Sequence, residues 1–185
     1  MMHESDELTY VVLDVPDPQA SSVMAIRKAH ADLVRAALAV EITLTESFDP
    51  AQSPGQAFTA LDDIAQEVPS IEASFAGAHR FPNSDTFVMR LADEAPFHAL
   101  HRKIASAGLT FLPSSYPFVP HCTLRTRSPV TPEDAAELLA TEIPGTMLLD
   151  TLSVYTLSRA PTPAGLRCVL RHRTQLRGSA HRTGT

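Results

Sequence analysis

Hydrophobic and polar positions along the chain predict a mixture of short strands and helices. Leu8–Val15 is rich in β-branched residues and stops at Pro16, which is typical of a strand. The apolar positions that follow have roughly helical spacing and predict a helix over residues 19–39. The rest of the pattern predicts strands over residues 40–45, 71–81, 86–91, 119–125, 147–157 and 166–173, and helices over residues 57–67, 94–107 and 131–140.

Several of these strands follow one another across short turns, which indicates antiparallel pairing. Residues 71–81 and 86–91, for example, flank a turn-forming segment of Pro82, Asn83, Ser84 and Asp85. This order favours the α+β class over a doubly wound parallel sheet. We expect one domain over residues 1–173, followed by a flexible basic tail over residues 174–185.

Composition narrows the classes of function. The 185 residues are 44% hydrophobic and 19% charged, which suits one globular domain, and the net charge of −6 argues against a non-specific nucleic-acid binder. A local pocket for one phosphate remains compatible with that charge. No apolar run approaches the ~18 residues needed to cross a bilayer, and the acidic start lacks a secretory core. We therefore expect a cytoplasmic protein without membrane contact.

The segment PFVPHCTLR, residues 117–125, carries the most informative chemistry. On a strand, residues two apart project from the same face, so His121 and Thr123 point the same way and Cys122 points the other way. An imidazole that moves a proton and a hydroxyl that binds a phosphoryl oxygen suit phosphate chemistry. A packed core histidine is the plain alternative. Two other His-x-Thr tripeptides, at His172 and His181, lie in or near the basic tail, and we discount them.

A weak internal repeat gives His121 a counterpart. Residues 39–45 (AVEITLT) align with residues 119–125 (VPHCTLR), so that Glu41 falls opposite His121 and Thr43 opposite Thr123. Such a repeat is expected of a fold with two related halves.

With these motifs, the chain resembles the 2H phosphoesterase superfamily, which includes 2′-5′ RNA ligases and cyclic phosphodiesterases. The resemblance covers about residues 8–173 and includes the first strand ending in DVP, the hairpin HRFPNSDTFVMRL, the helix before PFVPHCTL and the late strand LSVYTLSR. It implies a bilobal pseudo-twofold fold with two mainly antiparallel sheets, flanked by helices around a central cleft. It also implies a monomer without an obligate protein partner.

The resemblance further implies chemistry without a metal or cofactor. The family uses two histidines as general base and general acid, and two hydroxyls to hold the phosphate of a 2′,3′-cyclic phosphate or a 2′-5′-linked nucleotide or RNA end. Carried over, His121 becomes an acid or base, and Thr43 and Thr123 become phosphate ligands. Arg125 is a further candidate for phosphate contact because an arginine fork matches phosphate geometry. Tyr116 precedes the motif and is a candidate for stacking on a base.

Glu41 departs from the family, which has histidine at this position. A carboxylate can still accept a proton, so Glu41 is expected to act as base with His121 as acid. At ~4 Å and an effective dielectric of ~20, its charge would repel a phosphate by about 4 kcal/mol before compensation. One alternative is a degenerate member that binds a nucleotide or phosphate without efficient turnover. Another is a second histidine recruited from a pool of four, His79, His98, His101 and His172.

Overall fold

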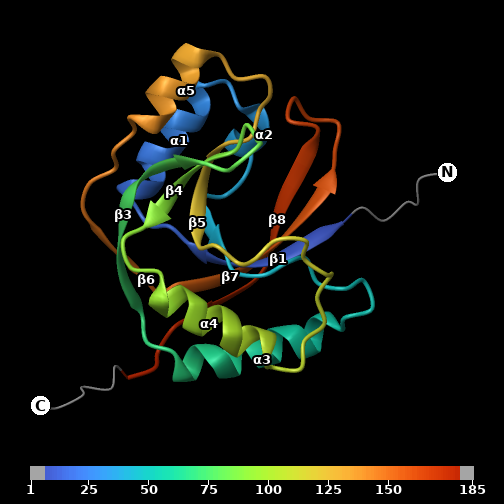
Figure 1. Cartoon of the computed structure of the whole chain (residues 1–185). Helices are drawn as coiled ribbons and strands as arrows, with labels where there is room; N and C mark the ends of the chain where they lie inside the picture. Colours follow the sequence, from blue (N-terminus) through green and yellow to red (C-terminus); the bar gives the residue numbers. More distant parts are fainter. Residues whose placement is uncertain (1–6, 180–185) are drawn as a thin grey trace, which may run out of the picture.

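The computed structural model describes residues 7–179, which form a strongly curved antiparallel sheet with helices packed against it (Figure 1). The class is α+β, as expected. The helices are α1 (Gln19–Ala29), α2 (Leu33–Ala36), α3 (Pro54–Glu67), α4 (Ala95–Ala105) and α5 (Pro132–Leu139). The strands are β1 (Leu8–Asp14), β2 (Glu41–Thr43), β3 (Ile71–Arg80), β4 (Phe87–Leu91), β5 (His121–Arg125), β6 (Thr146–Leu149), β7 (Thr151–Arg159) and β8 (Leu166–Gln175).

The strands form one hydrogen-bonded series in the order β6-β3-β4-β5-β2-β1-β7-β8, and each neighbouring pair is antiparallel. We expected two sheets, and the structure joins the two halves into one. The joint is the short pair of β2 and β5, in which Ile42 lies opposite Cys122. Four strands lie on each side of this joint, so β2 and β5, which carry the two sequence motifs, stand at the middle of the sheet.

The internal repeat proposed from the sequence agrees with the spacing of two pairs of strands. Glu41 and His121, which begin β2 and β5, are 80 residues apart, and so are Ile71 and Thr151, which begin β3 and β7. Because Ile42 pairs with Cys122, its own equivalent in the repeat, the two halves meet about the β2–β5 pair. Equivalent segments therefore face one another at the centre of the molecule.

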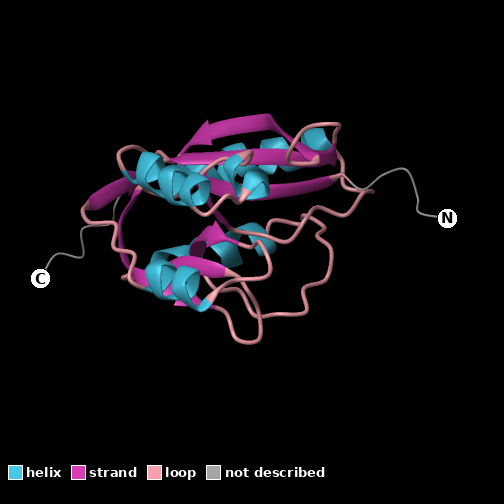
Figure 2. Ribbon diagram, turned by 90° about the horizontal axis from the view of Figure 1, so that it is seen from above, coloured by secondary structure: helices cyan, strands magenta, loops and turns pink. Residues whose placement is uncertain are grey.

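The helices lie in two groups that cover different halves of the sheet (Figures 1 and 2). Helices α1 and α5 pack on the half that contains β3 and β5, whereas α3 packs on β8 and against α4. One continuous hydrophobic core joins the groups, with Leu13, Ile42, Phe87, Phe97 and Leu124 fully buried. No helix in residues 7–179 is both long and apolar enough to cross a bilayer.

The single helix expected over residues 19–39 is broken in two. Helix α1 ends at Ala29, and Ala31 takes a left-handed backbone conformation with φ of 50°. Asp32 then caps α2 by accepting the N–H of Arg35, which favours a new start. The expected strand over residues 147–157 is likewise divided at Asp150, into β6 and β7.

The C-terminal boundary also differs from the expectation. The tail was expected to begin at residue 174, but β8 continues to Gln175 and Leu176 is buried in the core. The backbone N–H groups of Arg177 and Gly178 then donate to Ala65 and Val68 at the end of α3. Residues 174–179 therefore belong to the domain, while residues 180–185 lie outside the described part of the chain.

The buried side chain of Arg27 in α1 links β5 to the segment that leads into β2. Its guanidinium is fully buried and donates to the carbonyl oxygen of Thr123 on β5 through both Nε (3.1 Å) and Nη2 (2.8 Å). Its Nη1 donates to three carbonyls just before β2, those of Arg35, Leu38 and Ala39. Buried carbonyls and a buried charge are each costly without such partners.

We expect Arg27→Met to lower the free energy of unfolding by about 3 kcal/mol or more, because it leaves several buried carbonyls without donors. Urea unfolding followed by circular dichroism measures the change. The matched control is Arg127→Met, since Arg127 is exposed and, within residues 7–179, its side chain makes one hydrogen bond, to the carbonyl of Ala31. We expect that control to stay within about 0.5 kcal/mol of the parent. Equal unfolding midpoints for both variants would contradict the fastening role of Arg27.

Candidate functional site

The register of β2 and β5 brings both sequence motifs onto one face of the sheet. Because Ile42 lies opposite Cys122, the antiparallel ladder sets Glu41 opposite Thr123 and Thr43 opposite His121. Side chains alternate between faces, so these four project from the side opposite Ile42 and Cys122. Each proton-transfer candidate thus stands across from the hydroxyl of the other half, with about 4.5–5.5 Å between facing Cβ atoms in such pairs.

Glu41 and Thr43 are already in contact within β2. The Thr43 hydroxyl donates to Glu41 Oε2 at 2.8 Å. Both residues are partly buried, whereas Thr123 across the strand pair is buried. The Thr43 hydroxyl must leave Glu41, or share its contact, to serve a phosphate oxygen.

The His121 ring is held in one orientation by two contacts. Its Nδ1 lies 2.6 Å from the carbonyl oxygen of Val119, and the ring of Phe81 packs edge-on at 5.0 Å between centroids. Because a carbonyl oxygen only accepts, Nδ1 carries the proton in this contact. Nε2 is therefore the nitrogen that remains to exchange a proton with a substrate. Phe81 also lines a surface depression of about 570 Å³ beside the β3–β4 turn.

Burial shifts the pKa values of Glu41 and His121 in opposite directions. Burial raises the pKa of Glu41, against the hydrogen bond from Thr43 and the charges of Arg35 and Arg27, while Asp14 adds to the rise. Burial lowers the pKa of His121, against its bond to Val119, and Arg35 and Arg90 lower it further. The two groups are thus closer in proton affinity than a free carboxylate and imidazole, which suits a proton-exchanging pair.

Cys122 lies away from this chemistry, as the strand alternation predicts. Its thiol is fully buried, and burial raises its pKa to about 12. A thiol with so high a pKa is a poor nucleophile at neutral pH. Cys122 belongs to the core.

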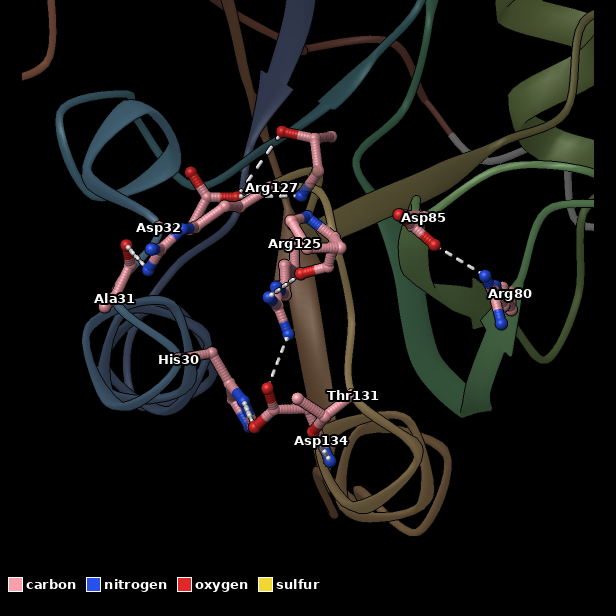
Figure 3. A network of polar contacts seen from close by, with 11 residues as sticks. His30, Ala31, Asp32, Arg80, Asp85, Arg125, Arg127, Thr131 and Asp134 are labelled. Atoms are coloured by element: carbon pink, nitrogen blue, oxygen red, sulfur yellow. Dashed lines mark hydrogen bonds and ion pairs between the residues drawn. The ribbon is translucent and has the colours of Figure 1, made fainter.

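Arg125 does not fit the substrate contact that the sequence suggested. Its side chain is only 4% exposed, and Nη1 lies 3.3 Å from Asp134 Oδ2 in α5 while Nη2 donates to the carbonyl of Pro129. Asp134 also lies 3.4 Å from His30 at the end of α1, so Arg125 joins an internal network between the helices (Figure 3). We leave Arg125 out of the candidate site.

The same network contains the one group in residues 7–179 with metal-ligand spacing, formed by His30, Asp134 and Glu137. Its ligand atoms lie within 4.8 Å of one another. Asp134 is already neutralised by the guanidinium of Arg125. We therefore interpret the group as part of the contact between α1 and α5.

The remaining sequence candidates lie in different places. Tyr116 is 82% exposed in the loop before β5, so its stacking role stays a prediction. Among the histidines, His79 pairs with Val88, which pairs with Thr123, and so shares the site face two strands away. The ring of His101 stacks on that of Phe118, with 4.1 Å between the ring centroids, and the ring of His98 meets Phe118 edge-on. His172 stacks on Phe58 in α3. His181 lies outside the described residues.

Two residues that the sequence did not single out help to build the site. Arg35 extends from α2 to Thr126, just after β5, and its charge acts on both Glu41 and His121. Asp32 is buried and accepts the backbone N–H groups of Arg35, Thr126 and Arg127, which fastens α2 to the end of β5. An aspartate is a common N-cap and could have indicated a new helix start at Asp32. The apolar spacing over residues 19–39 instead predicted one uninterrupted helix.

Comparison with known proteins gives a consistent result. Residues 15–161 match the model of the family described as the 2′-5′ RNA ligase superfamily. The crystal structure of TT0787 of Thermus thermophilus is similar at a TM-score of 0.66 and 16% identity, covering 94% of this chain and 100% of that one. E. coli LigT is similar in its apo form (TM-score 0.58) and complexed with 3′-AMP (0.59), each at 19% identity and covering 92% of this chain and 98% of LigT. No curated protein matches in sequence.

We expect Asp32→Asn to destabilise the fold by about 2 kcal/mol at neutral pH, because an amide replaces the acceptor of three backbone N–H groups. Burial opposes ionisation, but those N–H donors hold the pKa of Asp32 below its usual value. The charge therefore stabilises the fold above the ordinary aspartate pKa, and this contribution is lost as the pH falls through the lowered value. The difference in free energy of unfolding between the variant and the parent should therefore become smaller at acidic pH. Urea midpoints over a pH series measure it, with exposed Asp63→Asn as control; a deficit independent of pH would refute the charge-based account.

Proposed function

The chain belongs to the 2′-5′ RNA ligase superfamily, and from this premise we propose that it is a metal-independent phosphoesterase acting on 2′,3′-cyclic phosphates or 2′-5′-linked nucleotide or RNA ends. One observation carries the proposal: the β2–β5 register gathers a carboxylate, an imidazole and two hydroxyls on one face of the sheet. The complexes of E. coli LigT with 3′-AMP and with phosphate support a nucleotide or phosphate ligand for the fold.

In the proposed reaction, Glu41 and His121 divide the proton transfers. Glu41 accepts a proton from the attacking water, and the water oxygen forms a bond to phosphorus. The bond from phosphorus to the leaving ribose oxygen breaks, and Nε2 of protonated His121 gives that oxygen a proton. The bond from Nδ1 to Val119 fixes the ring for this transfer.

The hydroxyls of Thr43 and Thr123 complete the site by donating to the non-bridging phosphate oxygens. Thr43 is the more constrained of the two, because its hydroxyl donates to Glu41 in the present arrangement. That bond also favours the second candidate function, a member that binds a nucleotide or phosphate without efficient turnover. In that case Glu41 keeps its charge and its contact with Thr43 when a ligand enters.

We expect the purified protein to hydrolyse 2′,3′-cyclic nucleotides with EDTA present, and His121→Ala to lower kcat/KM by about 10²–10⁴-fold through loss of the proton donor. His172→Ala is the matched control, because His172 faces α3 from the far side of the sheet. Chromatographic product analysis measures both. Saturable binding without turnover would establish the degenerate alternative instead. An equally large loss in His79→Ala would point to a recruited histidine.

We expect the pH dependence of kcat/KM to be a narrow bell. Activity should fall in acid as Glu41 takes up a proton, at a pH above the ordinary glutamate pKa because burial raises the pKa of Glu41. It should fall in base as His121 loses its proton, at a pH below the ordinary histidine pKa because burial lowers the pKa of His121. Glu41→Gln should remove the acid limb and keep the basic limb. Survival of an unchanged acid limb in that variant would exclude Glu41 as the base.

A further inference from the structure

The proposed site has a deficit of positive charge. Glu41 brings a carboxylate to the place where a phosphate would bind, and burial, which lowers the pKa of His121, makes the protonated imidazole that the reaction needs harder to form. Arg125 is turned into the interior, where Asp134 neutralises it. Arg27 is fully buried and its donors are occupied by carbonyl groups. Arg90, the neighbour of His121 on β4, forms an ion pair with Glu94.

Arg35 is the arginine that the fold fixes beside this site. Its Nε donates to the hydroxyl of Thr126 at 3.3 Å, one residue beyond β5. Its backbone carbonyl accepts from Arg27 Nη1 at 3.1 Å, and the same guanidinium of Arg27 binds the carbonyl of Thr123. Asp32 adds a third link, because it accepts N–H groups from both Arg35 and Thr126. The helix that carries Arg35 is therefore fastened to the strand that carries His121 and Thr123.

The side chain of Arg35 has donors left for a ligand. It is partly exposed, and within residues 7–179 its guanidinium makes one hydrogen bond, through Nε. Nη1 and Nη2 thus remain, and together they form the edge of the fork that suits two phosphate oxygens. Burial raises the pKa of Glu41 and of Tyr10 and lowers the pKa of His121, and the charge of Arg35 acts downward on all three. These three residues stand on neighbouring strands with their side chains on the face of the candidate site.

We propose that Arg35 binds the substrate phosphate and offsets the repulsion that Glu41 exerts on it, an inference that rests on the proposed function. The family resemblance offers no signal for this role, because α2 is separate from both motifs along the chain. Arg35 would be a ligand of the reacting group, and Asp32 and Thr126 would be its positioning residues.

The test compares Arg35→Gln with Arg35→Lys, Thr126→Val and the exposed control Arg127→Gln. We expect Arg35→Gln to raise KM for uridine 2′,3′-cyclic phosphate, and the inhibition constant of inorganic phosphate, by about tenfold or more, as expected for loss of a charged hydrogen bond. Arg35→Lys should recover part of the loss because it keeps the charge. Thr126→Val removes only the anchor of Nε and should have a smaller effect. The Arg127→Gln control should match the parent.

A second measurement tests whether the charge of Arg35 acts at the site or whether Arg35 only supports the helix. The charge of Arg35 lowers the proton affinity of both Glu41 and His121, together with Arg27 on the first and Arg90 on the second, while Asp14 acts in the opposite direction on Glu41. Removing it should move both limbs of the pH profile to higher pH. It should also raise the pKa of His121 in an NMR titration, which needs no activity. Neither shift is expected from a loosened helix alone.

The outcomes distinguish the two proposals. If the parent binds inorganic phosphate by calorimetry but hydrolyses nothing, the enzymatic proposal fails and Arg35 is judged by phosphate affinity alone. If the parent turns over the cyclic nucleotide and Arg35→Gln matches it in KM, phosphate inhibition and His121 titration, the role of Arg35 is overturned while the proposed function stands. If the parent shows neither binding nor turnover, both fail.

Discussion

The buried guanidinium of Arg27 is the contact on which the geometry of the site depends. It binds the carbonyl of Thr123 in the middle of β5 and the carbonyls that lead into β2, so that one side chain links the two central strands. The pair they form is short, with Ile42 opposite Cys122. A three-residue strand has little hydrogen bonding of its own, and the arginine supplies the missing constraint from the helix side. Together with the strand pairing, these contacts hold the backbone that carries the four side chains of the candidate site.

A second set of contacts, made by Asp32, positions a charged side chain beside the same strands. Asp32 ends the turn after α1, begins α2 and accepts N–H groups from the segment after β5. The break between the helices therefore serves to direct α2, and Arg35 with it, toward the site strands. A continuous helix over residues 19–39 would have carried Arg35 elsewhere. In the proposed arrangement, the negative charge of Glu41 is balanced by the nearby guanidinium of Arg35, which opposes the rise that burial causes in the pKa of Glu41.

The internal repeat of the fold explains why the candidate site lies at the centre of the sheet. Equivalent residues of the repeat, Ile42 and Cys122, pair with each other, so each half contributes one proton-transfer candidate and one hydroxyl. Two-fold pairing brings together groups that are 80 residues apart without a long loop between them. The halves have diverged in the side chain they present, glutamate in one and histidine in the other, and burial moves the pKa of each toward that of its partner.

The sequence alone determined the features that follow from local periodicity. Alternation along a strand placed His121 and Thr123 on one face, and likewise Glu41 and Thr43. It also placed Cys122 on the opposite face, in the core. The offset of the internal repeat related the two motifs to each other. Tertiary structure decided which arginine remains beside the site: Arg125, next to the motif, is held by Asp134, and Arg35 arrives from another segment. The physical reason is that face alternation is fixed by the backbone geometry of neighbouring residues. The partner of a charged side chain depends on packing between segments far apart in the chain, and no local pattern encodes it.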